Sequence, residues 1–173
     1  MKRAAIALGG NLGDSATILG QALGELERVK GIKLEAHSQW YQTAAVGPPQ
    51  PDYLNGCAIV QVDLSPLDLL HKLLEIEQLF GRVRRERWGP RTLDLDLIFY
   101  EDLILETPEL QIPHPRCRER AFVLLPLAEI VRGNNIPIDR RAQALRPYSN
   151  GFCPQCRGEL RSPKRYIIRA QVP

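Results

Sequence analysis

The sequence lacks an apolar run long enough to cross a bilayer, and the apolar stretch at residues 4–8 is too short for a secretory signal. Cysteine is also scarce, and its four positions do not form the dense pattern of a secreted disulfide scaffold: Cys57, Cys117, Cys153 and Cys156. We therefore expect a cytoplasmic protein with reduced thiols and no membrane partner.

A Gly-Lys-Ser or Gly-Lys-Thr phosphate loop is missing too, so the glycines within residues 9–13 predict a tight turn. Nor is there a strong charge imbalance: 23 basic and 20 acidic residues give a net charge of +3, which is too small to predict a nucleic-acid partner. Only five of the basic residues are lysine, and the planar fork of arginine suits phosphate contacts. The composition therefore favours anionic ligands.

What is present is enough apolar material for one globular domain, since 44% of the 173 residues are hydrophobic. We expect this domain to span residues 1–135. Residues 136–173 have too few apolar side chains for a second core and are expected to form a basic tail, because residues 140–169 hold eight basic residues and one acidic residue.

Apolar periodicity predicts alternating strands and helices in the domain. Strands are expected at residues 4–8, 32–43, 53–64 and 93–100, and helices from Asp14 or Ser15 to about residue 30, over 66–80 and over 121–130. The leading order of strand, helix, strand, strand, helix, strand is that of a split βαβ unit. The predicted fold is thus an α+β, ferredoxin-like sandwich in which helices pack on a sheet that contains antiparallel strands.

Two carboxylates stand on one face of the last expected strand. Asp94 and Asp96 are two residues apart, so their side chains point the same way while the alternating leucines face the core. Such a pair repels itself unless it is well hydrated or a cation lies between its members, and hard oxygen ligands select Mg²⁺ over Zn²⁺. Taken alone, an Asp-x-Asp pair is more often a solvent-facing strand surface.

An arginine-rich loop precedes the carboxylates directly. Residues 82–91 contain one tryptophan, Trp88, and five arginines: Arg82, Arg84, Arg85, Arg87 and Arg91. Alone, this loop is more often a solvated connection or a nucleic-acid patch. Cation-holding carboxylates next to anion-holding arginines instead predict a site for a metal-bound nucleotide.

Further candidates lie elsewhere along the chain. Tyr53 and Asn55 are also two apart in a strand, so a ring and an amide share a face that suits a flat heterocycle, although Tyr53 taken alone is more often a plain strand aromatic. His114 stands between two prolines and serves either as a phosphate donor or as a turn residue. Both interpretations remain open.

Cys153 and Cys156 have the spacing of one zinc knuckle. A tetrahedral structural site needs four ligands, and no second knuckle occurs. One interpretation is that two chains together complete a Cys₄ zinc site in a dimer. The other is that the two cysteines are free thiols in the tail of a monomer, and we expect a monomer.

The run Glu-Arg-Trp-Gly-Pro-Arg-Thr-Leu-Asp-Leu-Asp at residues 86–96 is highly specific, and it is accompanied by the segments 7–12, 47–55, 81–84 and 113–122. Through these motifs, residues from about 3 to about 131 resemble the 6-hydroxymethyl-7,8-dihydropterin pyrophosphokinase family of folate biosynthesis. The resemblance implies a ferredoxin-like fold. It also implies transfer of the terminal diphosphate of ATP to the hydroxymethyl group of the pterin, with release of AMP.

The resemblance also implies roles for individual residues. Two Mg²⁺ ions are expected on Asp94 and Asp96, and the expected catalytic set is Arg82, Arg84, Arg91, Asp94 and Asp96. ATP contacts are implied for Glu77, Arg84, Arg91, His114 and Arg120. The pterin pocket is implied for Thr43, Val46, Tyr53, Asn55, Trp88 and Phe122. One departure is Gly10, which stands where the family usually has serine.

Two rival hypotheses remain. The first is an inactive homologue that binds nucleic acid or a protein partner through its basic tail, and salt-dependent binding without AMP formation would favour it. The second is another Mg²⁺-dependent phosphotransferase on the same scaffold. The expected partners of the enzyme itself are ATP and the hydroxymethyldihydropterin.

Overall fold

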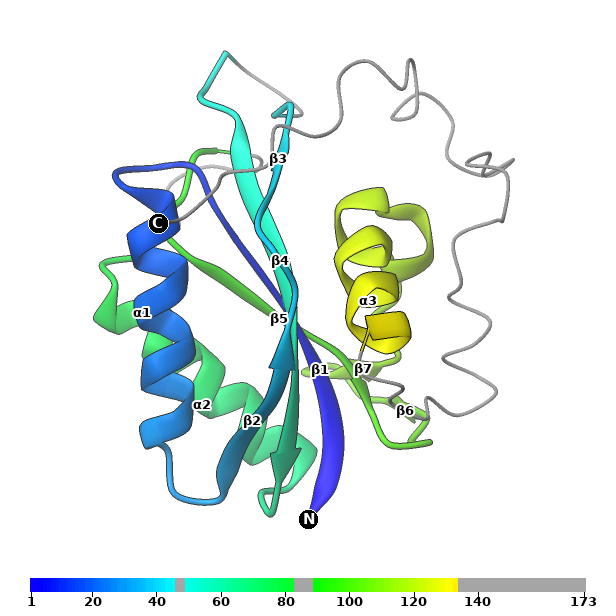
Figure 1. Ribbon diagram of the computed structural model, residues 1–173. Coiled ribbons are helices and arrows are strands. Elements are labelled where there is room, and N and C mark those ends of the chain that lie inside the picture. Colours follow the sequence, from blue (N-terminus) through cyan, green and yellow to red (C-terminus); the bar gives the residue numbers. More distant parts are fainter. Residues whose placement is uncertain (46–48, 83–88, 134–173) are drawn as a thin grey trace.

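A five-stranded sheet carries two helices on one face and a third helix on the other (Figure 1). The structure is a computed structural model, and it describes residues 1–45, 49–82 and 89–133. The elements, in chain order, are β1 (Lys2–Gly10), α1 (Ser15–Arg28), β2 (Ile32–His37), β3 (Tyr41–Thr43), β4 (Tyr53–Val62), α2 (Pro66–Leu79), β5 (Asp94–Tyr100), β6 (Leu105–Glu106), β7 (Gln111–Ile112), the short 3-10 helix η1 (Cys117–Glu119) and α3 (Ala121–Gly133).

The strands follow the order β2-β4-β1-β5, and β3 pairs with β4 next to the segment that pairs with β2. Each of these pairings is antiparallel. Because β2 and β3 share one edge, they act together as a single strand of the split βαβ unit. The predicted α+β, ferredoxin-like fold is therefore confirmed.

The strand expected without interruption over residues 32–43 is broken between β2 and β3. Ser38 maintains the pairing at the break: its backbone N–H donates to the Cys57 carbonyl over 2.9 Å, and its hydroxyl accepts from the Cys57 N–H over 3.0 Å. Side-chain alternation does not report such a break, because the backbone groups remain satisfied. The β6–β7 hairpin was not predicted either, since strands of two residues carry no periodic signal.

Local capping fixes where the first two helices begin. The Asp14 carboxylate accepts from the Thr17 N–H over 3.2 Å, so Asp14 is the N-cap of α1. Ser65 caps α2 in the same way through the Asp68 N–H over 3.2 Å, with Pro66 in the first turn. Both starts agree with the sequence. No helix within the described ranges is long and apolar enough to cross a membrane.

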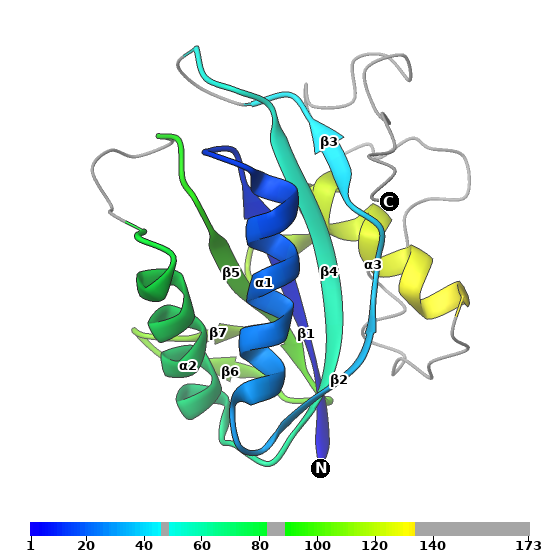
Figure 2. The ribbon, with the colours of Figure 1, turned by 60° about the vertical axis from the view of Figure 1, so that its left-hand side comes forward.

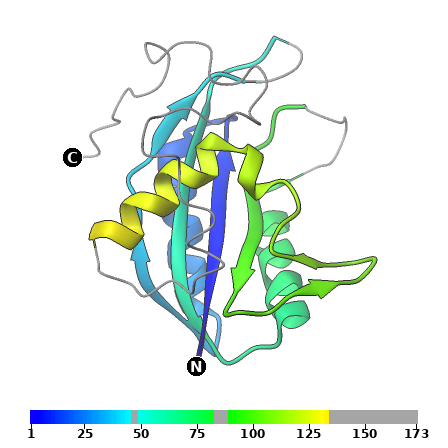
Figure 3. The same ribbon diagram turned by 90° about the vertical axis from the view of Figure 1, so that its right-hand side faces the viewer.

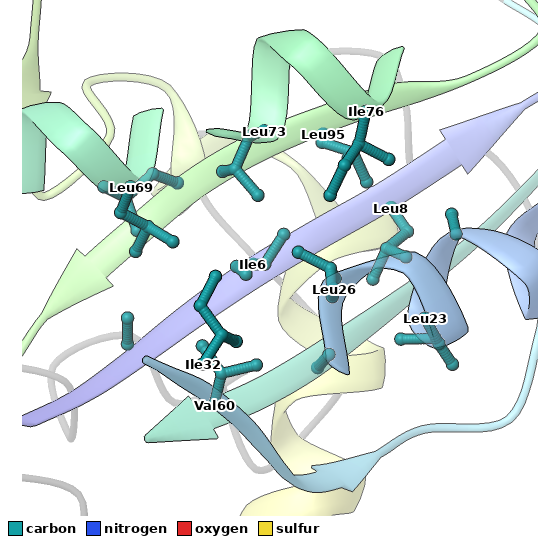
Figure 4. Packing of buried hydrophobic residues seen from close by; sticks show 14 of the residues in the cluster. Ile6, Leu8, Leu23, Leu26, Ile32, Val60, Leu69, Leu73, Ile76 and Leu95 are labelled. Carbon is teal, nitrogen blue, oxygen red and sulfur yellow. The ribbon is translucent and has the colours of Figure 1, made fainter. Parts of the chain in front are cut away.

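The sheet has an apolar core on each face. Helices α1 and α2 cover one face (Figure 2), where Ile6 and Leu8 of β1 lie among helical side chains such as Leu26 and Leu73 (Figure 4). Each of these large side chains contributes about 1.5–3 kcal/mol when fully buried. The smaller core lies beneath α3 (Figure 3) and includes Ile59, Ile98, Leu127 and Ile130. The α3 face also bears the polar side chains described next.

Candidate functional site

The paired carboxylates of β5 lie on the α3 face of the sheet. Asp94 and Asp96 keep 23% and 32% of their side chains exposed, whereas Leu95 between them is buried in the core on the opposite face. The neighbouring strand β1 places Gly9 opposite Asp94 and Ala7 opposite Asp96. Because both neighbours are small, β1 leaves the carboxylates uncovered. The two carboxylates share one face, as the alternation in the sequence predicted.

Three arginines surround these carboxylates. Arg82 and Arg91 each pair with Asp94, through N–O distances of 2.6 and 2.7 Å, and Arg120 pairs with Asp96 over 3.1 Å. Burial and the charge of Asp94 nevertheless raise the pKa of Asp96 above its ordinary value. The site therefore combines concentrated negative charge with donors that suit phosphate oxygens.

Glu77 of α2 supports the carboxylate pair from inside the protein. Its side chain is only 2% exposed, its Oε1 accepts from the Leu95 N–H over 2.7 Å, and it forms an ion pair with Arg82. Burial raises the pKa of Glu77, while the Leu95 N–H and Arg82 oppose the rise. Glu77 thus holds the backbone between Asp94 and Asp96. The contact between Glu77 and ATP that the resemblance implies stays a prediction. The sequence signal for the support of β5 was the position of this glutamate within the apolar stripe of a helix.

Asn55, a candidate for binding a heterocycle, lies in β4, which is separated from β5 by β1. Asn55 of β4 pairs with Gly9 from the side opposite Asp94, so Asn55, Gly9 and Asp94 form one row across three strands. Asn55 is buried and donates from Nδ2 to the Thr43 hydroxyl over 2.7 Å, which fixes the orientation of the amide. A Cβ at Gly9 would lie 2.9 Å from Asn55 Oδ1, so the amide oxygen faces the centre of this row.

Aromatic side chains flank the row. The Tyr53 hydroxyl donates to the Gly89 carbonyl over 3.2 Å, linking β4 to the segment that carries Arg91. At the start of α3, the centroid of the Phe122 ring lies 5.6 Å from the guanidinium carbon of Arg120. Arg120 also pairs with Asp96. The aromatic side and the carboxylate side are therefore joined by arginines.

His114 lies close enough to the Asp96 carboxylate to interact with its charge. Its backbone N–H donates to the Ile98 carbonyl over 2.9 Å, and its Nδ1 accepts from the Arg116 N–H over 3.1 Å. Burial lowers the pKa of His114, and Arg120 and Arg116 add to this, while Asp96 opposes it. The ring is thus neutral near pH 7 with its proton on Nε2, which makes Nε2 a donor for an anionic ligand.

Magnesium fits the residues present. Proteins usually hold Mg²⁺ through one or two carboxylates together with substrate phosphates. Asp94 and Asp96 supply two hard oxygen ligands, and the repulsion that raises the pKa of Asp96 is of the kind that a divalent cation relieves. Within the described part of the chain there is no cluster of three or more His, Cys, Asp or Glu side chains that could form an all-protein metal cage.

Contacts or strand register bring most of the sequence-predicted residues together around this end of β5. The arrangement includes Thr43, Tyr53, Asn55, Glu77, Arg82, Arg91, Asp94, Asp96, His114, Arg120 and Phe122. Five other candidates lie outside the described residues: Val46, Arg84, Trp88, Cys153 and Cys156. So does the predicted domain boundary at residue 135. Sequence reasoning missed Asn11, a buried polar residue at the edge of the site.

Comparison with known proteins supplies independent findings. A family model described as 7,8-dihydro-6-hydroxymethylpterin-pyrophosphokinase matches residues 5–132. A Synechocystis protein named 2-amino-4-hydroxy-6-hydroxymethyldihydropteridine pyrophosphokinase is 58% identical over 127 residues, covering 73% of this chain and 65% of its own length. A Pseudomonas aeruginosa protein of the same name is 41% identical over 146 residues, covering 84% of this chain and 90% of its own length.

Solved structures agree at the level of the fold. The crystal structure of Plasmodium falciparum HPPK-DHPS wild type with pteroate matches with a TM-score of 0.59 and 14% identity, covering 75% of this chain and 39% of that one. At this identity the likeness concerns the fold alone. The matched region is less than two thirds of the Synechocystis and Plasmodium chains.

Proposed function

The chain belongs to the 7,8-dihydro-6-hydroxymethylpterin-pyrophosphokinase family, and from this premise we propose that it transfers diphosphate from ATP to the hydroxymethyl group of 6-hydroxymethyl-7,8-dihydropterin, releasing AMP, in folate biosynthesis. One observation carries the proposal beyond family membership. Asp94 and Asn55 pair with the same glycine from opposite sides, so a phosphate-directed group and a heterocycle-directed group flank a residue without a side chain. Such a row suits two substrates that must meet.

We propose that Asp94 and Asp96 hold the two magnesium ions that accompany ATP. Bound Mg²⁺ supplies neutralisation of phosphate charge and lowers the pKa of a hydroxyl that it coordinates. The carboxylates provide the anionic side of this arrangement, and Glu77 keeps their backbone in place through Leu95. The number of ions follows from resemblance to the family.

The donors around the carboxylates have the complementary task. Arg82, Arg91 and Arg120 already lie at the carboxylates, and their guanidinium groups are suited to the phosphate oxygens. The neutral His114 supplies a further N–H donor, and we assign Arg84 to the same set by resemblance. Positioning and electrostatic stabilisation supply most of the acceleration in phosphoryl transfer, so we assign no general base.

The pterin is proposed to lie against Asn55 and Thr43, with the rings of Tyr53 and Phe122 beside it. The fixed amide of Asn55 presents an acceptor, as recognition of a heterocycle edge requires, while aromatic rings cover the heterocycle faces. Val46 and Trp88 join this pocket by resemblance. Closure of the pocket excludes water as a competing acceptor.

The oligomeric state, the cellular location and the role of the tail are also proposals. We propose a monomer that acts in the cytoplasm; zinc binding by Cys153 and Cys156, with the dimer that it implies, is the alternative for the tail. The comparisons lend no support to an inactive nucleic-acid or partner-binding module.

The test uses the full chain with ATP and Mg²⁺, and AMP is quantified by chromatography with and without hydroxymethyldihydropterin. We expect AMP to form only when the pterin is present. Asp96→Asn should lower the rate by about 100-fold or more. The variant loses a carboxylate that is proposed to hold the Mg²⁺ that neutralises phosphate charge. The control is Asp63→Asn, an exposed carboxylate at the far end of the fold, which should retain the wild-type rate. Pterin-independent AMP release, or normal activity of Asp96→Asn, would contradict the proposal.

A further inference from the structure

Asn11 stands immediately after β1 and is only 4% exposed. Its side chain uses both kinds of hydrogen-bonding group. Nδ2 donates to Gln50 Oε1 over 3.0 Å and to the Pro51 carbonyl over 2.9 Å, and Oδ1 accepts from the Arg91 N–H over 2.9 Å. The Asn11 backbone N–H also donates to the Arg91 carbonyl over 2.9 Å.

These bonds join segments that are distant in sequence. Pro51 lies 40 residues and Arg91 lies 80 residues along the chain from Asn11. A residue with a purely local role bonds to its near neighbours, as the N-cap Asp14 does with Thr17. Asn11 instead sets the position of two remote segments relative to the end of β1.

Each remote segment carries one side of the candidate site. The Arg91 guanidinium pairs with Asp94, so the segment held by Asn11 Oδ1 leads into the carboxylate pair. Gln50 and Pro51 precede β4, and Gln50 Oε1 lies 3.4 Å from the Tyr53 hydroxyl, so the segment held by Asn11 Nδ2 leads into the aromatic side. A single amide therefore lies between the two sides.

We propose that Asn11 is a positioning residue that holds the phosphate side and the heterocycle side of the site in one fixed relation. The inference rests on the proposed function, in which the two substrates must meet there. An amide is required because the position needs two N–H donors and one acceptor, which neither aspartate nor serine supplies. Reaction between two bound substrates is sensitive to such placement, since a displacement of about 1 Å can cost about 100-fold in rate.

Asn11→Ala removes all three side-chain bonds. We expect kcat/KM to fall about 100-fold and the KM values for both substrates to rise. The matched control is Ser38→Ala, because Ser38 is also a buried polar residue whose hydroxyl bonds to backbone groups, donating to the Gln39 carbonyl over 2.8 Å and accepting from the Cys57 N–H. Ser38 lies at the break between β2 and β3, so its loss should lower stability and leave both KM values unchanged.

A second pair of variants tests one arm and covers the case in which Asn11→Ala does not fold. Gln50→Glu keeps an oxygen that accepts from Asn11 Nδ2, whereas Gln50→Met removes it at similar size. We expect Gln50→Met to raise the KM for the pterin about 10-fold and Gln50→Glu to stay closer to the wild type. Equal KM values for the two variants would overturn the proposal.

Amide hydrogen exchange gives a readout that needs no substrate. The Arg91 N–H donates to Asn11 Oδ1, so its exchange should be about 10-fold faster in Asn11→Ala, or in Asn11→Ser if the alanine variant does not fold, with core amides such as that of Ile59 unchanged. If the wild type releases no AMP, the proposed function fails, and exchange at Arg91 still decides the positioning role. Unchanged Arg91 exchange, or a Ser38→Ala variant that raises both KM values as strongly, would overturn it.

Discussion

At the scale of single residues, identifiable partners fix the orientation of the buried polar groups of the site. The Thr43 hydroxyl fixes the Asn55 amide, and the Leu95 N–H together with Arg82 fixes the Glu77 carboxylate. In both cases a buried polar side chain is satisfied by the protein, as burial requires. For Asn55, the bond from Nδ2 to Thr43 leaves Oδ1 directed at the row through Gly9.

Asn55→Ala should weaken pterin binding about 10- to 100-fold and leave affinity for a non-hydrolysable ATP analogue within about 2-fold. The reason is that the amide hydrogen bond, worth about 1–3 kcal/mol when a partner is left unpaired, concerns the heterocycle alone. Titration calorimetry with each ligand checks this. Gln42→Ala, a half-buried neighbour on β3 whose amide donates to Asp52, is the control. Equal losses for the two ligands would argue against the pocket.

Two variants of Glu77 should differ in stability. Glu77→Leu leaves the Leu95 N–H and Arg82 without their buried partner and should cost about 3–5 kcal/mol, whereas Glu77→Gln keeps a carbonyl oxygen for Leu95 and should cost less. Urea denaturation of both variants measures the difference. If the two unfold at the same urea concentration, Glu77 does not support β5 as described.

At the scale of elements, the end of β1 approaches the segment before β5 so closely that no side chain fits. A Cβ at Gly10 would lie 2.3 Å from the Thr92 carbonyl oxygen. The close approach therefore depends on the missing side chain of Gly10. The segment concerned leads directly to Asp94.

Gly10→Ala should therefore destabilise the protein by about 1–3 kcal/mol, because the backbone must shift to relieve the overlap. Gly24→Ala is the matched control: it lies in α1, an added Cβ would have no atom within 4 Å beyond its chain neighbours and the backbone of its own helix, and it should stabilise by about 0.5–1 kcal/mol. Thermal denaturation measures both. A Gly10→Ala protein as stable as the wild type would show that the approach is not constrained.

An ion pair also connects two strands that are not neighbours in the sheet. Arg3 of β1 reaches across β4 to Glu35 of β2, with Nε–Oε2 and Nη2–Oε1 distances of 2.8 and 2.7 Å. The hydrogen bond from Arg3 lowers the pKa of Glu35 from its ordinary value of 4.5. A carboxylate with a lowered pKa stabilises the folded state above its ordinary pKa, and this contribution is lost as the pH falls through the lowered value.

Glu35→Gln should thus reduce the free energy of unfolding by about 1 kcal/mol near pH 7, a modest figure because both side chains are partly exposed. The difference from the wild type should shrink as the pH falls below 4.5 and the wild-type carboxylate gains its proton. Denaturant titrations at a series of pH values measure it. A difference that stays constant through that range would contradict the assignment.

At the scale of the whole molecule, the sequence predicted the fold class because strand and helix periods differ and their order is characteristic of a split βαβ unit. The period of two also placed Asp94 with Asp96 and Tyr53 with Asn55. Periodicity says nothing about pairing between distant segments. The row through Gly9, the role of Glu77 beneath β5 and the bonds of Asn11 therefore required coordinates.

The transfer of an intact diphosphate between two substrates held side by side is tested most directly with ATP labelled at its β-phosphorus. The full chain is incubated with labelled ATP, Mg²⁺ and hydroxymethyldihydropterin, and the products are separated. We expect all transferred label in a pterin diphosphate, with unlabelled AMP in equal amount. Label that remains in ADP, or a pterin that stays unlabelled while ATP is consumed, would contradict the proposed reaction.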